Sequence, residues 1–151
     1  MSKKLLTLMI LGALVLAGCN QNTSEKKGSI EYKNDKSEGS VEVGENVKLP
    51  DDFPEDVPVY KNAKIKGTNI SKMDNGKLMV ITMQTDDNLQ DIGKFYKDEL
   101  IKNGFGIENE FETDKSVTLT SRKGSTTVIV SAITQNGKTT IGTNVTIKKE
   151  Q

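Results

Sequence analysis

Cys19 offers the most distinctive chemistry in this chain, because it is the single cysteine among 151 residues. A thiol can act as a nucleophile, bind a metal or form a disulfide. A disulfide needs a second cysteine, and the chain has no histidine with which one thiol could build a catalytic pair or a zinc site. We therefore expect Cys19 to serve as an attachment point for another molecule.

The residues before Cys19 indicate what is attached. Lys3 and Lys4 are followed by an apolar run over residues 5–16, which is shorter than the roughly 20 residues of a membrane-spanning helix. A basic start, a short apolar stretch and small residues before a cleavage point are typical of a secretory signal. The motif Leu16-Ala17-Gly18-Cys19 resembles the lipobox of bacterial lipoprotein precursors.

This resemblance implies that the signal peptide, residues 1–18, is cut off and that Cys19 receives a diacylglycerol group. Two acyl chains, palmitate among them, anchor a protein durably, whereas one chain binds a membrane only marginally. The implied location is the outer face of a bacterial cell membrane. The alternative is an incidental cysteine at the end of an ordinary signal peptide.

The charge of the mature chain bears on its partners. Removing residues 1–18 takes away two lysines and no acid, so the formal charge changes from zero to about −2. Nucleic-acid binding calls for a basic face, and Arg122 is the single arginine of the chain. We therefore expect no nucleic-acid partner, but a monomer that contacts the membrane through its lipid and an unidentified envelope protein or ligand.

Two groups of side chains could bind metals. Thioethers bind Cu(I), and two methionines lie four residues apart on one predicted strand. Carboxylates bind calcium, and four acids lie among the three prolines at positions 50, 54 and 58. Methionine is ordinary core material, however, and the acids do not follow the spacing of a calcium loop. We expect no metal and no other cofactor at Met79, Met83, Asp51, Asp52, Glu55 or Asp56.

Two functional hypotheses follow. The first is a non-enzymatic binding module displayed outside the cell. The alternative is a small envelope hydrolase that acts on wall or phosphate-bearing substrates through acids such as Asp51, Asp56 or Glu108. The sequence carries no nucleophile, phosphate-binding or metalloprotease motif, so we favour the binding module and expect no enzymatic activity.

The composition divides the mature chain in two. Residues 19–48 are rich in Ser, Glu, Lys, Gly and Asn, which is typical of a flexible tether. The alternations Ile30/Tyr32 and Val41/Val43 leave open that this segment adds edge strands. Three prolines then mark the entry to a small extracytoplasmic domain, residues 49–151.

The domain begins with a predicted hairpin and a helix. Asn75-Gly76 lies between two β-rich runs and is typical of a tight hairpin turn. Residues 86–104 have apolar side chains at helical spacing. Asp87 with Gln90 resembles a capping box at the start of this helix, and Gly104 predicts its end.

Four alternating apolar runs separated by turn residues follow the helix, between residues 105 and 147. The predicted order is ββαββββ. We therefore expect an α+β fold with two layers, in which one amphipathic helix packs on a mostly antiparallel sheet.

A second resemblance covers about residues 50–148. Pro54-x-Asp56-x-Pro58-x-Tyr60, followed by Phe95-Tyr96, Leu100 and Gly104-Phe105, is similar to small secreted bacterial domains of uncharacterised function. Those motifs are structural, so the resemblance implies a fold and an extracytoplasmic location and supplies no active site.

One face of the predicted sheet is left without a helix, and it is the candidate contact surface. Its members are mostly threonines, with Ile129 and Ile133 as apolar exceptions. A polar face of this kind is normal for a solvated antiparallel sheet. Because arginine and apolar anchors are favoured in contact sites, Arg122, Ile129 and Ile133 are the possible binding patch. The full predicted face is Thr118, Thr120, Arg122, Thr127, Ile129, Ser131, Ile133, Thr140, Asn144 and Thr146.

Overall fold

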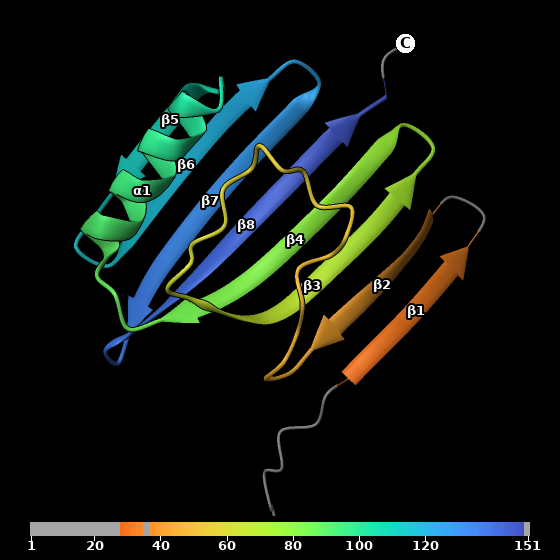
Figure 1. Ribbon diagram of the computed structural model, residues 1–151, viewed down its shortest axis with the longest axis horizontal. Helices are drawn as coiled ribbons and strands as arrows, with labels where there is room; N and C mark the ends of the chain where they lie inside the picture. The colour runs from red at the N-terminus through yellow and green to blue at the C-terminus, as the bar shows by residue number, and fades with distance from the viewer. Residues whose placement is uncertain (1–27, 35–36, 150–151) are drawn as a thin grey trace, which may run out of the picture.

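The computed structural model describes residues 28–34 and 37–149, which form one antiparallel sheet of eight strands and one helix (Figure 1). The signal segment and Cys19 lie outside the described residues. The helix, α1, spans Leu89–Lys102. The strands are β1 (Gly28–Asn34), β2 (Ser37–Val43), β3 (Lys64–Met73), β4 (Gly76–Thr85), β5 (Gly106–Glu112), β6 (Ser116–Lys123), β7 (Thr126–Gln135) and β8 (Lys138–Lys148).

The expected α+β class, with the order ββαββββ, is wrong: the fold is mainly β, because eight strands accompany a single helix of 14 residues. Two of these strands, β1 and β2, come from the segment that we expected to be a tether. β2 pairs with β3 in a register that runs from Ser37↔Met73 to Val43↔Gly67. Its main-chain groups are satisfied by this pairing, so the strand forms although it brings few apolar side chains to the core.

The strands lie in the order β1-β2-β3-β4-β8-β7-β6-β5, and every neighbouring pair is antiparallel. The first four strands form one half of the sheet, and β5 to β8 form the other. β8 lies in the middle, paired with β4 on one side and β7 on the other. The free edges are β1 and β5.

Tight turns fix the register of the hairpins. β7 and β8 are joined by Asn136 and Gly137, whose φ angles are 52° and 75°. Two successive positive φ angles are those of a type I′ turn, whose twist matches that of paired strands. The predicted hairpin at Asn75-Gly76 is confirmed, with β3 and β4 paired up to Met73↔Gly76.

The helix lies within the predicted residues 86–104, but its N-terminal cap is one residue later than expected. The side chain of Asn88, and not that of Asp87, accepts a hydrogen bond from the backbone N–H of Asp91. Asn88 also donates to the Asp91 carboxylate at 2.8 Å. At the other end, Gly104 has a φ of 86°, and the N–H of Phe105 donates to the carbonyl of Leu100, which is the arrangement that commonly ends helices.

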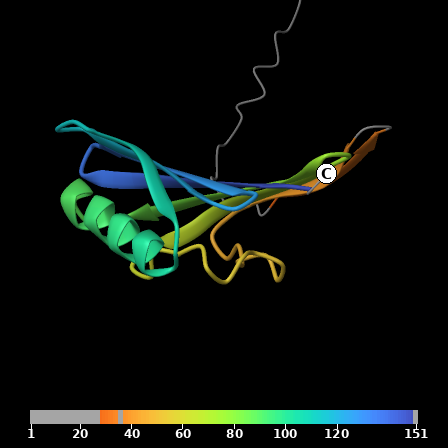
Figure 2. The ribbon, with the colours of Figure 1, turned by 90° about the horizontal axis from the view of Figure 1, so that it is seen from above.

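The helix and the segment 44–63 lie on the same side of the sheet (Figures 1 and 2). α1 packs against β5, β6 and β7, whereas the segment 44–63 crosses in front of β8, β4 and β3. We call this side of the sheet the covered face and the opposite side the open face.

The core lies between the covered face and these two elements. It contains Phe53, Val57 and Tyr60 of the segment together with the buried side of α1. Gly93 allows the helix to lie close, because a Cβ atom there would meet Val117 at 3.2 Å. Tyr96 is fully buried, and its hydroxyl lies 3.3 Å from that of Thr143 on β8.

Candidate functional site

The open face is a surface of the described chain that neither α1 nor the segment 44–63 covers (Figure 2). The strand registers show how it is built, because directly paired residues point to the same face. Ile129 pairs with Thr120 on β6 and with Asn144 on β8, and Ile133 pairs with Thr140. All ten residues predicted to share this face do so.

The same register extends the open face beyond the predicted strands. One continuous row of paired residues crosses all eight strands, and every member points to the open face. This row consists of Ile30, Val41, Asn69, Val80, Asn144, Ile129, Thr120 and Asn109.

The residues of the predicted patch lie together on this face, but its arginine already forms an ion pair. Arg122 lies at the end of β6, and its Nε donates to Glu108 Oε1 at 2.6 Å. This contact raises the pKa of Arg122 above its usual value. Ile129 and Ile133 are 38% and 57% exposed. The two isoleucines therefore offer contact area, whereas Arg122 already has a carboxylate partner.

Most of the exposed large apolar side chains gather on the open face. By strand alternation, six of the eight in the described residues lie there. Four of them were missed by the sequence reasoning: Ile30, Val43, Met73 and Phe111. The signal for Ile30 and Val43 was the alternation in the segment 28–43. Phe111 pairs with Thr118, and only this register shows that it points away from the helix.

Charge is distributed unequally between the two faces. Six acidic residues lie within the strands, and five of them point to the covered face by alternation. The sixth, Glu108, lies at the bulge of β5 and pairs with Arg122. The open face also carries Lys64, Lys138 and Lys148, so its strand residues have a small net positive charge.

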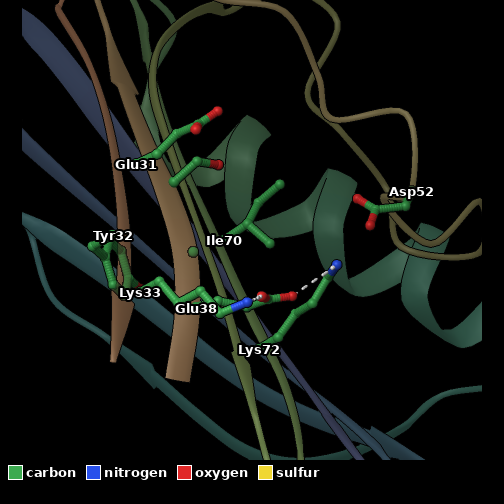
Figure 3. Close-up of a pocket in the computed structure, with 9 residues that line it drawn as sticks. Glu31, Tyr32, Lys33, Glu38, Asp52, Ile70 and Lys72 are labelled. Carbon is green, nitrogen blue, oxygen red and sulfur yellow. Dashed lines mark ion pairs between the residues drawn. The ribbon is translucent and has the colours of Figure 1, made fainter. Parts of the chain in front are cut away.

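A cavity of about 410 Å³ lies on the covered face beyond the end of the core, where β1, β2 and β3 meet the segment 44–63 (Figure 3). Glu38 lies between two lysines, with Nζ–O distances of 3.4 Å to Lys33 and 3.6 Å to Lys72. Asp52 faces the cavity and accepts a hydrogen bond from Lys77, which lowers the pKa of Asp52. These charges offset one another, so the cavity offers no concentrated charge to a ligand.

A second, larger hollow of about 760 Å³ runs between the proline-rich segment and α1. Leu49, Val59 and Phe95 contribute apolar surface to it, and Lys61 and Glu99 contribute charge. Its walls are formed by α1 and by the segment that closes the core, so this hollow is a groove between two elements that pack against each other.

The acids considered for hydrolysis or calcium binding do not converge. Asp56 accepts a hydrogen bond from Lys123 at 2.8 Å, and Glu108 accepts one from Arg122. Asp51 and Glu55 line the hollow beside α1, whereas Asp52 faces the cavity. Within residues 28–34 and 37–149, no group of three or more acidic, histidine or cysteine side chains is placed to hold a metal ion.

The methionines considered for copper lie in the core. Met79 and Met83 are both fully buried on β4. They belong to the hydrophobic cluster under the helix and the segment 44–63, so their thioethers serve as packing groups.

A tyrosine–aspartate contact joins the proline-rich segment to the start of the helix. Tyr60 donates a hydrogen bond to Asp87 at 2.7 Å, and Asn62 donates to the same carboxylate oxygen at 3.1 Å. Burial and the contact with Asp87 raise the pKa of Tyr60 to about 12. The bonds from Tyr60 and Asn62 hold the pKa of Asp87 below its usual 3.8. Asp87 thus holds the segment in place, which explains why Asn88 caps the helix.

In the described part of the chain, no helix combines the length and the apolar character that crossing a membrane requires. Residues 66–140, from β3 into β8, match a family model described as START domain-like. Neither a curated protein nor a solved structure matches the chain. The chain is thus similar to START domain-like proteins over a segment that contains α1 and most of the sheet, while β1 and β2 lie outside the match.

Proposed function

We propose that this protein is a bacterial lipoprotein, held at the outer face of the cell membrane by a diacylglycerol group on Cys19. Its sheet domain is a non-enzymatic binding module. The anchor is supported by the basic start, the short apolar run and the motif Leu16-Ala17-Gly18-Cys19. Binding is supported by one observation above all: six large apolar side chains are exposed on one uncovered face.

The open face differs from an ordinary solvated sheet in this respect. Threonine and serine at alternate positions are what water favours, and they make up much of β6, β7 and β8. Six large exposed apolar side chains on one face favour a contact surface instead; three of them lie on β1 to β3 and three on β5 and β7. Ile133, at 57% exposed, and Phe111, at 62%, extend from such a surface.

The carboxylates support a binding role over hydrolysis. A hydrolase needs acids that face one cleft with perturbed pKa values. Asp56 and Glu108 are each paired with a cation on a different part of the molecule.

The anchor is tested by metabolic labelling with a clickable fatty acid. The wild-type chain and a Ser24→Ala control should be labelled and cut before Cys19, whereas Cys19→Ser should remain unlabelled and uncut because the acyl acceptor is gone. Labelling of Cys19→Ser would contradict the anchor.

The binding surface is tested by crosslinking in intact cells. A photoreactive residue is placed at Ile133 on the open face or at Ile101 on α1, which are 57% and 53% exposed. We expect a defined adduct, with protein or lipid, from position 133 and none from position 101. Equal adducts at both positions would refute the assignment of the open face as the contact surface.

A further inference from the structure

The distance between the lipid and the sheet is short. β1 begins at Gly28, nine residues after Cys19. A chain spans at most about 3.4 Å per residue, so nine residues reach about 30 Å however they are arranged. The tether expected from composition, which ended at residue 48, would have reached about 100 Å by the same rule.

This reach is no larger than the domain itself. Eight strands at a spacing of about 4.8 Å make a sheet roughly 38 Å wide. An anchored domain of this size therefore stays beside the bilayer. Tethering makes any contact between the two intramolecular, so a weak affinity is enough to orient the domain.

The distribution of charged residues favours the open face as the side that turns toward the lipid. A membrane that contains anionic lipids attracts lysine and arginine and repels carboxylates. On the covered side, five of the six strand acids are nearly offset by Lys33, Lys72, Lys77 and Lys123. The segment 44–63 and α1 add eight acids against five lysines, so this side is net negative. The strands of the open face carry Lys64, Arg122, Lys138 and Lys148, of which Arg122 is paired with Glu108 and Lys138 with Asp86, so this face is net positive.

Five of the six exposed apolar side chains lie toward the end of the sheet that is joined to the anchor, and Met73 lies at the opposite end. Gly28 belongs to a row of paired residues that continues through Val43 and ends at Phe111 on the opposite edge. Ile30 and Ile129 belong to the adjacent row. Exposed apolar groups next to threonine hydroxyls suit an interface where acyl chains meet polar headgroups.

We propose that the open face of the sheet rests on the outer leaflet of the bilayer that holds the lipid on Cys19. This inference depends on the proposed anchor and names the partner of the open face. A second copy of the chain is a poorer occupant, because face-to-face pairing would bring together two surfaces of the same net positive charge.

The test uses the full mature lipoprotein in vesicles of phosphatidylglycerol and phosphatidylethanolamine. Acylated Cys19 has no free thiol, so a cysteine introduced elsewhere can be spin-labelled selectively. Thr118→Cys reports on the open face, and Lys94→Cys reports on the exposed side of α1. We expect an aqueous nickel chelate to relax the label at position 118 about tenfold less than the label at position 94, and lipid-soluble oxygen to relax it more.

A matched pair of substitutions links this protection to the face. Ile133→Glu should restore nickel access to the label at position 118, whereas Ile101→Glu, at a similarly exposed position on α1, should leave it unchanged. Equal nickel access at both labels in vesicle-bound protein would overturn the docking while leaving the anchor intact. Protection from both nickel and oxygen would also overturn it, because protein would then cover the face. Failure of the acylated chain to stay on the vesicles would refute the anchor itself.

Discussion

Replacing Tyr96 by alanine would show how firmly α1 is held on the sheet. The Tyr96 ring is fully buried, 5.2 Å from Phe95 at an interplanar angle of 82° and 6.4 Å from Tyr60 at 26°. Removing a buried aromatic side chain costs about 3–5 kcal/mol in lost burial and cavity formation. A small domain has about 5–15 kcal/mol in total, so Tyr96→Ala should remove about a fifth or more of the stability.

The hydroxyl of Tyr96 contributes much less than its ring. Its contact with Thr143 is long, at 3.3 Å, and a net hydrogen bond is worth about 1 kcal/mol. Tyr96→Phe should therefore lower the free energy of unfolding by about 1 kcal/mol. Burial also raises the pKa of Tyr96, so the hydroxyl stays protonated in this comparison.

The assay is urea unfolding of residues 20–151, without lipid, followed by far-ultraviolet circular dichroism because the chain has no tryptophan. Ile101→Ala is the control, since Ile101 is 53% exposed on the same helix and its loss should change the stability by about 0.5 kcal/mol or less. A loss below about 1 kcal/mol for Tyr96→Ala would refute the reasoning, because α1 would then not depend on its central ring.

Three further predictions concern the edges of the fold and its pH dependence. A chain of residues 49–151 keeps every member of the hydrophobic cluster but loses buried Val47. It should fold with about 2 kcal/mol less stability than residues 20–151. An unfolded fragment in circular dichroism would show that the residues before 49, which include β1 and β2, are indispensable. Because the pKa of Tyr60 is raised to about 12 from 10.0, the stability it contributes is present below pH 10 and is lost as the pH rises toward 12. Tyr60→Phe should reduce this loss in urea unfolding, to which Tyr96 with its raised pKa also contributes, and an unchanged loss would exclude Tyr60 as a source. A Cβ atom at Gly39 would overlap the carbonyl oxygen of Ile70 and the ring of Tyr32, so Gly39→Ala should raise amide hydrogen exchange across β2. Gly106→Ala is the control and should leave this exchange unchanged, because a Cβ atom there would lie 3.8 Å from its nearest neighbour, the carbonyl oxygen of Arg122.

Local signals predicted the elements that depend on local physics. The turn at Asn136-Gly137 and the end of the helix at Gly104 follow from residues that accept positive φ angles. The helix follows from apolar spacing. Asp87 was misread as the cap because its partner Tyr60 is 27 residues away in the chain, and a local pattern carries no information on such a contact.

The fold class was missed for a related reason. β1 and β2 have low apolar content, and composition alone indicates a tether. β2 is stabilised by pairing with β3, about 30 residues further along the chain, and β1 by pairing with β2. Their formation therefore depends on an edge that only the folded sheet provides. The same holds for the contact surface: alternation placed Ile129 and Ile133 together, whereas Phe111 and Ile30 join them only through the register of all eight strands.

The central position of β8 has a consequence for how the protein is made. β8 is the last strand of the described chain, and it is the one that joins β4 to β7. Until residues 138–148 have been made, the hairpins of β1 to β4 and the unit of β5 to β7 have no shared strand, so the full sheet cannot form. Contacts between distant segments also form slowly. The order of the strands in the chain thus makes the assembly of the sheet depend on its last described strand, which must pair with both halves.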